Sequence, residues 1–246
     1  MRAHVYMPDD TPSANIEECR LFGADVHLTP GVISDAAAAM NREKKDWFDV
    51  STLKEPYRLE GKKTMGFEIA EQYHWELPDV IVYPTGGGTG LIGMWKAFDE
   101  LEALGWISSR RPRMVSVQST GCAPVVKAFE AGAMVCESWP GASTVASGLR
   151  VPSPFADTLI LRSLYESGGT AIAVDDPTIL EAIRRMARTE GILLSPEGAS
   201  CIAALPELVR RGTLQPSSSA LVFNTGSAFK YGEVLRLAGN IQTVGG

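Results

Sequence analysis

Pro84-Thr85-Gly86-Gly87-Gly88-Thr89-Gly90 is the stretch on which the interpretation of this chain depends. It follows an apolar run, Val80 to Tyr83, that is typical of a buried strand, and it precedes a helix-like run from Leu91 to Leu104. Four glycines within five residues let backbone N–H groups converge on one anion, and the start of the following helix adds the positive end of its dipole. The pattern therefore predicts a phosphate-binding loop.

Strand-like and helix-like runs alternate along the rest of the chain. Strands are predicted at residues 2–7, 25–28, 47–50, 80–83, 114–118, 170–174, 192–194 and 220–223. Helices are predicted at residues 11–22, 34–45, 63–75, 91–104, 123–132, 155–166, 178–190 and 196–211. The alternation with short links predicts an α/β fold, in which helices cover a parallel sheet.

The irregular residues 51–61 indicate a crossing between two domains. We expect a partial small domain at 1–50 and a large domain at 51–246, with a loosely held tail after Gly239.

Bulk composition limits the classes of function. The chain has 246 residues, of which 45% are hydrophobic and 21% charged, and its net charge of −6 argues against a nucleic-acid partner. No apolar run approaches the roughly 20 residues of a membrane span. The apolar stretch at the start of the sequence is too short for a signal peptide. We therefore expect a soluble, cytoplasmic protein.

Cysteine and histidine spacing predicts no metal site. Cys19, Cys122, Cys136 and Cys201 form no C-x-x-C pair, so buried free thiols are favoured over zinc or redox chemistry. The three histidines are scattered along the chain.

The kind of phosphate follows from the residues around the glycines. Gly88 to Gly93 fits the G-x-G-x-x-G pattern of dinucleotide-binding loops, but such sites also need an acid at the end of the next strand. That strand ends in Val117-Gln118-Ser119-Thr120, without one. The loop also lacks the Gly-Lys-Ser/Thr step of a triphosphate-binding loop. A small monophosphate is favoured, and a nicotinamide-dependent oxidoreductase remains as an alternative.

Longer stretches carry a resemblance to a known family. They are Gly61–Gln72, Pro78–Gly93, Val117-Gln118 with Gly121-Cys122-Ala123-Pro124, and Phe223-Asn224-Thr225-Gly226-Ser227. These resemble threonine synthases, which belong to the fold-type-II, tryptophan-synthase-β-like group of pyridoxal-phosphate enzymes. The resemblance extends from Met7 to Tyr231 and implies three-layer αβα domains with parallel sheets, incomplete at the N-terminus.

The resemblance also assigns the cofactor-binding residues. It implies that the phosphate of pyridoxal 5′-phosphate (PLP) is held by the backbone N–H groups of Gly86, Gly87, Gly88, Thr89 and Gly90. Thr225 corresponds to the residue whose hydroxyl meets the pyridine nitrogen. A hydroxyl cannot protonate that nitrogen as a carboxylate would, which suits elimination or replacement better than transamination. The implied activity converts O-phosphohomoserine and water to threonine and phosphate.

In the family, the lysine that binds PLP covalently and a Ser-Gly-Asn stretch lie upstream of the match to residues 2–8. Neither is found in this sequence, so we expect an N-terminally truncated member without a catalytic residue. Lys62 and Lys63 lie on the non-catalytic side, and Lys230 is interpreted as a solvated surface lysine. The chain alone is expected to be catalytically incompetent and to hold PLP non-covalently at best.

Several alternatives stay open. Serine/threonine dehydratases and diaminopropionate ammonia-lyases share the scaffold, and a non-catalytic fragment that binds a phosphorylated ligand also fits. Glu197, in the first turn of a helix that starts at Ser195-Pro196, is interpreted as complementing the helix dipole rather than reaching into the substrate site. An incomplete sheet invites self-association, and the family is commonly dimeric, so a homodimer is one expectation.

Overall fold

A computed structural model describes residues 1–240, and the expected loose tail falls on residues 241–246, outside the described residues. The described strands form two parallel sheets. The small sheet pairs β1 (His4–Pro8) with β2 (Asp25–Thr29). The main sheet has the order β5-β4-β3-β6, in which the strands are β3 (Val80–Pro84), β4 (Arg113–Ser119), β5 (Thr170–Val174) and β6 (Ala220–Val222).

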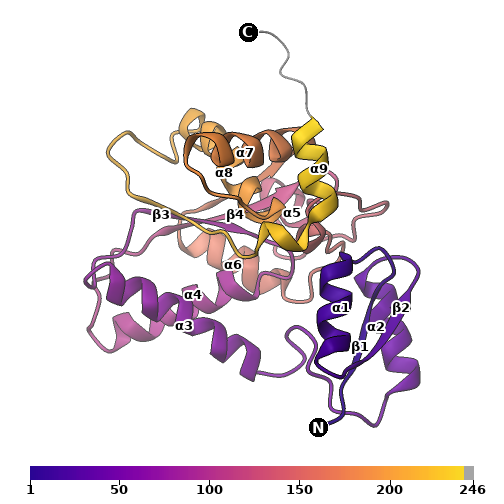
Figure 1. Cartoon of the computed structure of the whole chain (residues 1–246). Helices are drawn as coiled ribbons and strands as arrows, with labels where there is room; N and C mark the ends of the chain where they lie inside the picture. The colour runs from indigo at the N-terminus through magenta and orange to yellow at the C-terminus, as the bar shows by residue number, and fades with distance from the viewer. Residues whose placement is uncertain (241–246) are drawn as a thin grey trace.

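Helices cover both faces of the main sheet (Figure 1). One face carries α3 (Tyr57–Gln72), α4 (Thr89–Ala103), α5 (Pro124–Glu130) and α6 (Asp157–Glu166). The other face carries α7 (Asp176–Thr189), α8 (Pro196–Arg210) and α9 (Gly232–Asn240). Two 3₁₀ turns, η1 (Ser147–Leu149) and η2 (Ala228–Lys230), lie in the connections. The predicted three-layer αβα arrangement with a parallel sheet is confirmed.

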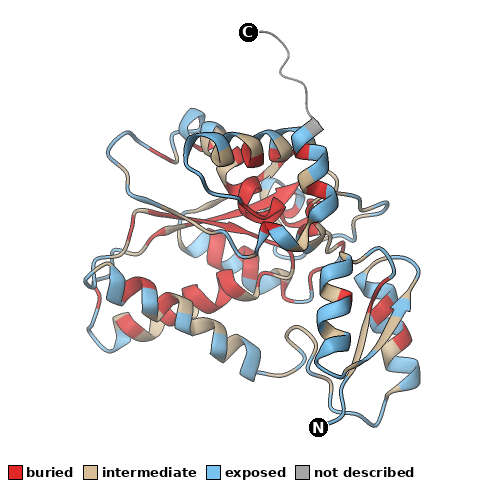
Figure 2. Ribbon diagram, viewed as in Figure 1, coloured by how far each residue is buried: buried red, intermediate tan, exposed pale blue. Residues whose placement is uncertain are grey.

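The strands of the main sheet are apolar on both faces because both faces are covered. Ile81 and Met114 point into the core beneath α3, α4 and α6, whereas Val82 and Val115 point into the core beneath α7 and α8. All four side chains are fully buried. Figure 2 shows these strands as the most buried part of the molecule. The continuous apolar runs that mark strands in the sequence are thus explained by burial on two sides.

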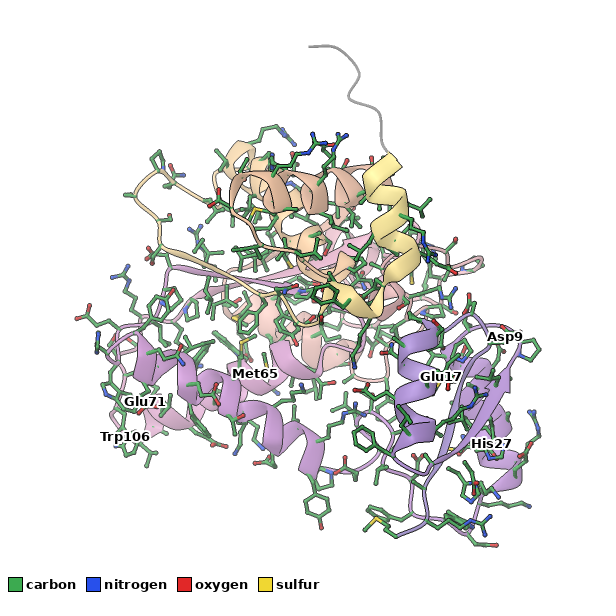
Figure 3. The ribbon with its side chains drawn as sticks, viewed as in Figure 1. Asp9, Glu17, His27, Met65, Glu71 and Trp106 are labelled. Carbon is green, nitrogen blue, oxygen red and sulfur yellow. The ribbon has the colours of Figure 1, made fainter. Side chains whose placement is uncertain are left out.

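The small sheet lies to one side of the main sheet with α1 (Ser13–Leu21) and α2 (Ile33–Glu43), as Figure 1 shows. In Figure 3 the labelled Asp9, Glu17 and His27 lie in this part of the chain, on the opposite side of the view from Glu71 and Trp106. The boundary between two domains at residue 50 stays a prediction. Two ion pairs link the small sheet's region to the rest: Arg150 with Asp10, and Lys230 with Glu18.

Two predicted strands are wrong. Residues 47–50 form no strand, because the chain turns after α2, where Trp47 N–H donates to the Lys44 carbonyl. Trp47 meets β1 only through its ring, which packs edge-on against His4. Residues 192–194 complete the end of α7 instead: Gly191 has a φ of 68°, and Ile192 N–H donates back to the Met186 carbonyl. Only Leu194 pairs, in a single bridge to Ser227.

The predicted helix at 63–75 begins earlier, at Tyr57. The Glu55 carboxylate accepts hydrogen bonds from the N–H groups of Tyr57 and Arg58, at 2.5 and 3.2 Å, and so satisfies the first donors of α3. The sequence analysis assigned these residues to an irregular crossing. A carboxylate that precedes a proline at the helix start is the signal that was missed.

Candidate functional site

The backbone N–H groups of residues 86–91 have no hydrogen-bond acceptor anywhere in residues 1–240. The N–H groups on either side are paired: Thr85 donates to the Val117 carbonyl at 2.8 Å, and Ile92 donates to the Gly88 carbonyl at 3.0 Å. No side chain caps α4, whose N-cap residue is Gly88. Buried N–H groups are almost always paired, so an uninterrupted run of free donors at a helix start is a site for a ligand with several acceptor oxygens.

Three glycines of this loop lie where no side chain fits. A Cβ at Gly86 would lie 2.2 Å from the Gly148 carbonyl oxygen, and a Cβ at Gly90 would lie 2.1 Å from the Tyr83 hydroxyl. Gly88 has a φ of 73°, in the left-handed region, and a Cβ there would lie 2.3 Å from Ile160. The loop is therefore held by close packing on one side, and its N–H groups are left to the other.

Gln118 at the end of β4 fixes the loop from below. Its side chain is fully buried, and its amide Nε2 donates to the Thr85 carbonyl at 3.1 Å. Its Oε1 accepts from the N–H groups of Val125 and Val126, at 2.9 and 3.2 Å, which are the first free donors of α5. Gln118 is thus a non-local cap that joins the loop to α5. The sequence analysis used Gln118 only to show that the strand ends without the acid that a dinucleotide-binding site needs.

Glu197 in the first turn of α8 is buried rather than solvated. Its carboxylate accepts hydrogen bonds from Gly148 N–H and from the Tyr231 hydroxyl, both at 2.8 Å. The helix position agrees with the expected dipole contact, but the two partners come from other segments. Because Gly148 in turn packs on Gly86, Glu197 holds in place the turn that backs the glycine loop.

Thr225 lies just beyond β6, at the same edge of the main sheet as the glycine loop. β6 is the direct neighbour of β3, with Val82 opposite Val222, so the residues that follow each strand emerge side by side. Thr225 itself is exposed. Its neighbour Asn224 accepts from the N–H and hydroxyl of Ser195, at 3.1 Å each, which anchors this segment to α8. The structure therefore brings Thr225 and residues 86–90 to one edge.

Most lysines of the described chain are engaged elsewhere. Lys63 pairs with Glu60 and Glu100 on the α3–α4 surface. Lys230 is half-exposed, as expected for a surface lysine, and it forms an ion pair with Glu18. Lys62 lies on α3 with its backbone against Gly93, one turn into α4. The three lysines weighed from the sequence are thus not gathered at the glycine loop.

Tyr83, whose hydroxyl packs against Gly90 of the loop, keeps its proton at neutral pH. Burial raises the pKa of Tyr83 to about 12, and its ring packs edge-on against Phe223 with centroids 5.2 Å apart. All four cysteines are free thiols; Cys122 and Cys201 are buried, whereas Cys19 and Cys136 are partly exposed. Burial raises the pKa of Cys136 to about 11. The donors that the loop itself offers an anion are backbone N–H groups.

The histidines are less scattered than the sequence implied. His4 and His27 meet across the small sheet, with Nδ1 and Nε2 3.2 Å apart. In residues 1–240 no group of three or more His, Cys, Asp or Glu side chains is arranged to hold a metal ion. Within the same residues, no helix combines the length and the apolar character needed to cross a bilayer.

Comparison with characterised sequences gives consistent relatives. The chain is 39% identical over 217 residues to the threonine synthase of Methanosarcina acetivorans, covering 87% of this chain and 53% of that protein. It is 33% identical over 216 residues to the threonine synthase of Methanocaldococcus jannaschii, again covering 87% and 53%. The chain therefore spans about half the length of these relatives.

Solved structures give the same fold. The L-serine ammonia-lyase of Rhizomucor miehei superposes with a TM-score of 0.74 at 19% identity, covering 95% of this chain and 74% of that one. The fold is that of the tryptophan-synthase-β-like, fold-type-II PLP enzymes, as the resemblance implied. The family model described as pyridoxal-phosphate dependent enzyme matches residues 1–226. With the glycine loop, the fold and these relatives in agreement, the chain belongs to the family of pyridoxal-phosphate dependent enzymes of the threonine synthase type.

Proposed function

We propose that residues 86–91 bind the 5′-phosphate of PLP and that Thr225 faces the pyridine nitrogen of the same molecule. The observation that carries this proposal is the run of N–H groups without acceptors at the start of α4. A phosphate supplies several acceptor oxygens and a negative charge, and both are favoured at a helix N-terminus. The residues present therefore fit the phosphate end of the cofactor.

The position of Thr225 supports the second half of the assignment. Thr225 and the glycine loop follow neighbouring strands, so one flat ring can reach both. PLP, when bound, supplies an electron sink for bonds at the α-carbon of an amino acid. A hydroxyl opposite the ring nitrogen accepts or donates a hydrogen bond without transferring a full charge. This favours elimination and replacement chemistry.

The activity we propose for the whole enzyme is that of threonine synthase, which forms threonine and phosphate from O-phosphohomoserine and water. For these residues on their own we propose non-covalent binding of PLP and no turnover. Lys63 and Lys230 are held by carboxylates, and the backbone of Lys62 faces Gly93 rather than the loop. We therefore expect none of these three lysines to attach PLP covalently or to transfer the proton at the α-carbon.

The test compares two ligands that differ only in the phosphate. The full chain is dialysed to equilibrium against PLP and, separately, against pyridoxal. We expect PLP to bind at least about tenfold more tightly, because charge-assisted hydrogen bonds to the loop are available to PLP alone. Equal affinities, or no PLP binding at all, would overturn the assignment of the loop.

The absence of turnover is tested separately. The PLP-saturated chain is treated with borohydride and digested, and lysine adducts are located by mass spectrometry. We expect scattered, substoichiometric labelling and no phosphate release from O-phosphohomoserine. A stoichiometric adduct at one residue, such as Lys62, would overturn the claim of non-covalent binding while leaving the loop assignment intact.

A further inference from the structure

A cavity of about 340 Å³ opens at the opposite edge of the main sheet, where β3 and β4 begin. Its walls are Asp79, residues 110, 111 and 113, and residues 215, 217 and 218 of the connection between α8 and β6. Trp106, which is labelled in Figure 3 near Glu71, comes shortly before the cavity residues 110, 111 and 113 in the chain. β4 rises about 3.3 Å per residue, so about 20 Å separates the cavity from the glycine loop.

Three arginines line this cavity, and two of them are balanced by carboxylates. Arg110 pairs with Asp79, and Arg111 pairs with Asp99 and Glu102. The backbone N–H of Arg113, at the start of β4, donates to the Asp79 carbonyl at 2.9 Å, whereas its guanidinium forms no hydrogen bond or ion pair with any described residue. A guanidinium carries five N–H donors, so the cavity wall holds a cation whose donors are all free.

The connection opposite Arg113 adds neutral donors. The Ser217 hydroxyl has no partner among the described residues, and the Ser218 hydroxyl accepts from Gln215 N–H at 3.1 Å and keeps its own proton free. The one carboxylate of the wall, Asp79, already accepts from Arg110 and from the N–H and hydroxyl of Ser219. Free donors therefore outnumber free acceptors, and the complementary ligand is an anion.

We propose that this cavity binds a phosphate group, either free or as part of a small phosphate ester, between the Arg113 guanidinium and the hydroxyls of Ser217 and Ser218. The donors come from two segments of the chain that line the cavity, the start of β4 and the connection between α8 and β6. A tetrahedral phosphate offers oxygens in several directions, whereas a carboxylate offers two in one plane. The volume lies at the lower end of small-molecule pockets. The site shares no residue with the glycine loop and stands independently of the PLP proposal.

The test resolves the two phosphate sites residue by residue. Inorganic phosphate is titrated at low ionic strength into the ¹⁵N-labelled full chain, and the backbone amides of Arg113, Ser217 and Ser218 are followed apart from those of residues 86–91. We expect saturable shifts in the first group. Arg113→Gln should raise their dissociation constant about tenfold, and Arg113→Lys, which keeps the charge but not the fork, should give an intermediate value.

Two controls make the result specific. Arg188→Gln removes an exposed arginine of α7 and should leave both groups of amides as in the wild type. Gly88→Ala, which displaces the glycine loop through its clash with Ile160, should abolish the response of residues 86–91 and leave that of Ser217 and Ser218. Far-UV circular dichroism of each variant confirms that the fold is retained.

The source of the phosphate is assigned with two further probes. Methyl phosphate that shifts the same amides with equal or higher affinity identifies a phosphate ester as the ligand, and a preference for inorganic phosphate identifies the free ion. Acetate at equal ionic strength should cause no saturable shift. The proposal is overturned if phosphate leaves Ser217 and Ser218 unaffected, if acetate binds as well as phosphate, or if Arg113→Gln binds as the wild type does.

Discussion

The two anion sites that we propose lie at opposite edges of the main sheet, and their donors differ in kind. At the carboxyl edge, the free donors are backbone N–H groups of residues 86–91, and the side chains that position them, such as Gln118, are buried and uncharged. At the amino edge, the free donors belong to the side chains of Arg113 and Ser217, in an open cavity. One set of strands therefore ends in a site made of backbone and begins in a site made of side chains.

This difference determines which substitutions each edge tolerates. A backbone site is destroyed by adding atoms, because its shape depends on close packing, and among substitutions only one by proline removes a backbone N–H. A side-chain site is destroyed by removing a charge and is indifferent to small changes of packing around it. The consequences can be measured as unfolding free energies and binding constants, and we take them from the largest expected effect to the smallest.

The largest effect is expected for Gly88→Ala. The φ of 73° costs alanine about 1–2 kcal/mol, and the new Cβ would lie 2.3 Å from Ile160, a fully buried side chain. Overpacking adds about 1–3 kcal/mol, so we expect a total loss near 3 kcal/mol in urea unfolding and at least about tenfold weaker PLP binding.

The matched control is Gly105→Ala. Gly105 has a φ of 71°, but a Cβ there meets nothing within 4 Å. The same backbone strain is thus imposed without the clash, and we expect a loss of about 1 kcal/mol with unchanged PLP affinity. Equal losses for the two variants would show that packing against Ile160 does not shape the loop.

The second effect concerns Gln118→Met, which keeps the length of the side chain and removes its polar atoms. The Thr85 carbonyl and the N–H groups of Val125 and Val126 then lose their buried partner. We expect a loss of about 2 kcal/mol and weaker PLP binding.

Gln215→Met makes the same change at the amino edge. Gln215 is exposed, and its amide makes one hydrogen bond, 3.0 Å long, to the Gly212 carbonyl. We expect a stability change within about 0.5 kcal/mol. If Gln215→Met cost as much as Gln118→Met, the contrast between a buried and an open edge would be lost.

Much more of the site at the carboxyl edge than of the site at the amino edge could be predicted from the sequence. Glycines between a strand and a helix have one main use, so Gly86 to Gly90 pointed to an anion without any knowledge of the fold. Thr225 was found through the resemblance. Arg113 and Ser217 are more than 100 positions apart, and only the strand order that places β6 beside β3 and β3 beside β4 brings them together.

Separation along the chain also explains why the contacts of Glu197 at the carboxyl edge were not predicted. Glu197 contacts Gly148 and Tyr231, which come from segments on either side of it in the chain. Helix-dipole reasoning uses only neighbours in sequence and therefore did not identify these two partners. The predicted strand at residues 47–50 is wrong for the opposite reason. Local composition favours a strand, but a strand needs a neighbouring strand to pair with. The ring of Trp47 packs against His4 instead.

A third, smaller effect is expected for Tyr231→Phe. The variant removes the hydroxyl that donates to Glu197, and the carboxylate keeps its bond from Gly148 N–H. Burial, followed by the nearby Glu197 carboxylate, raises the pKa of Tyr231, so the hydroxyl is protonated and available as a donor at neutral pH. We expect a loss of about 1.5 kcal/mol in urea unfolding.

Tyr57→Phe is the control for this prediction. Tyr57 is exposed, and its hydroxyl makes no hydrogen bond to a described residue, so its removal should change stability by less than about 0.5 kcal/mol. A Tyr231→Phe variant as stable as Tyr57→Phe would show that Gly148 alone satisfies Glu197.

The smallest effect is a pH dependence at the amino edge. Hydrogen bonds from Ser219 N–H, the ion pair with Arg110 and the bond from the Ser219 hydroxyl lower the pKa of Asp79 below its usual value of 3.8. A carboxyl whose pKa is lower in the folded state stabilises the fold above the unfolded pKa, and this contribution is lost as the pH falls through the folded pKa.

Asp79→Asn should therefore lower stability at pH 7, and the gap between variant and wild type should close as the pH falls below about 4. Urea unfolding midpoints at pH 7, 5, 4 and 3 measure this gap, with Asp46→Asn, an exposed acid of the turn after α2, as the control for removing one charge. A gap that stays constant with pH would mean that Asp79 holds Ser219 at the start of β6 by shape rather than by charge. The amino edge would then depend on packing, as the carboxyl edge does.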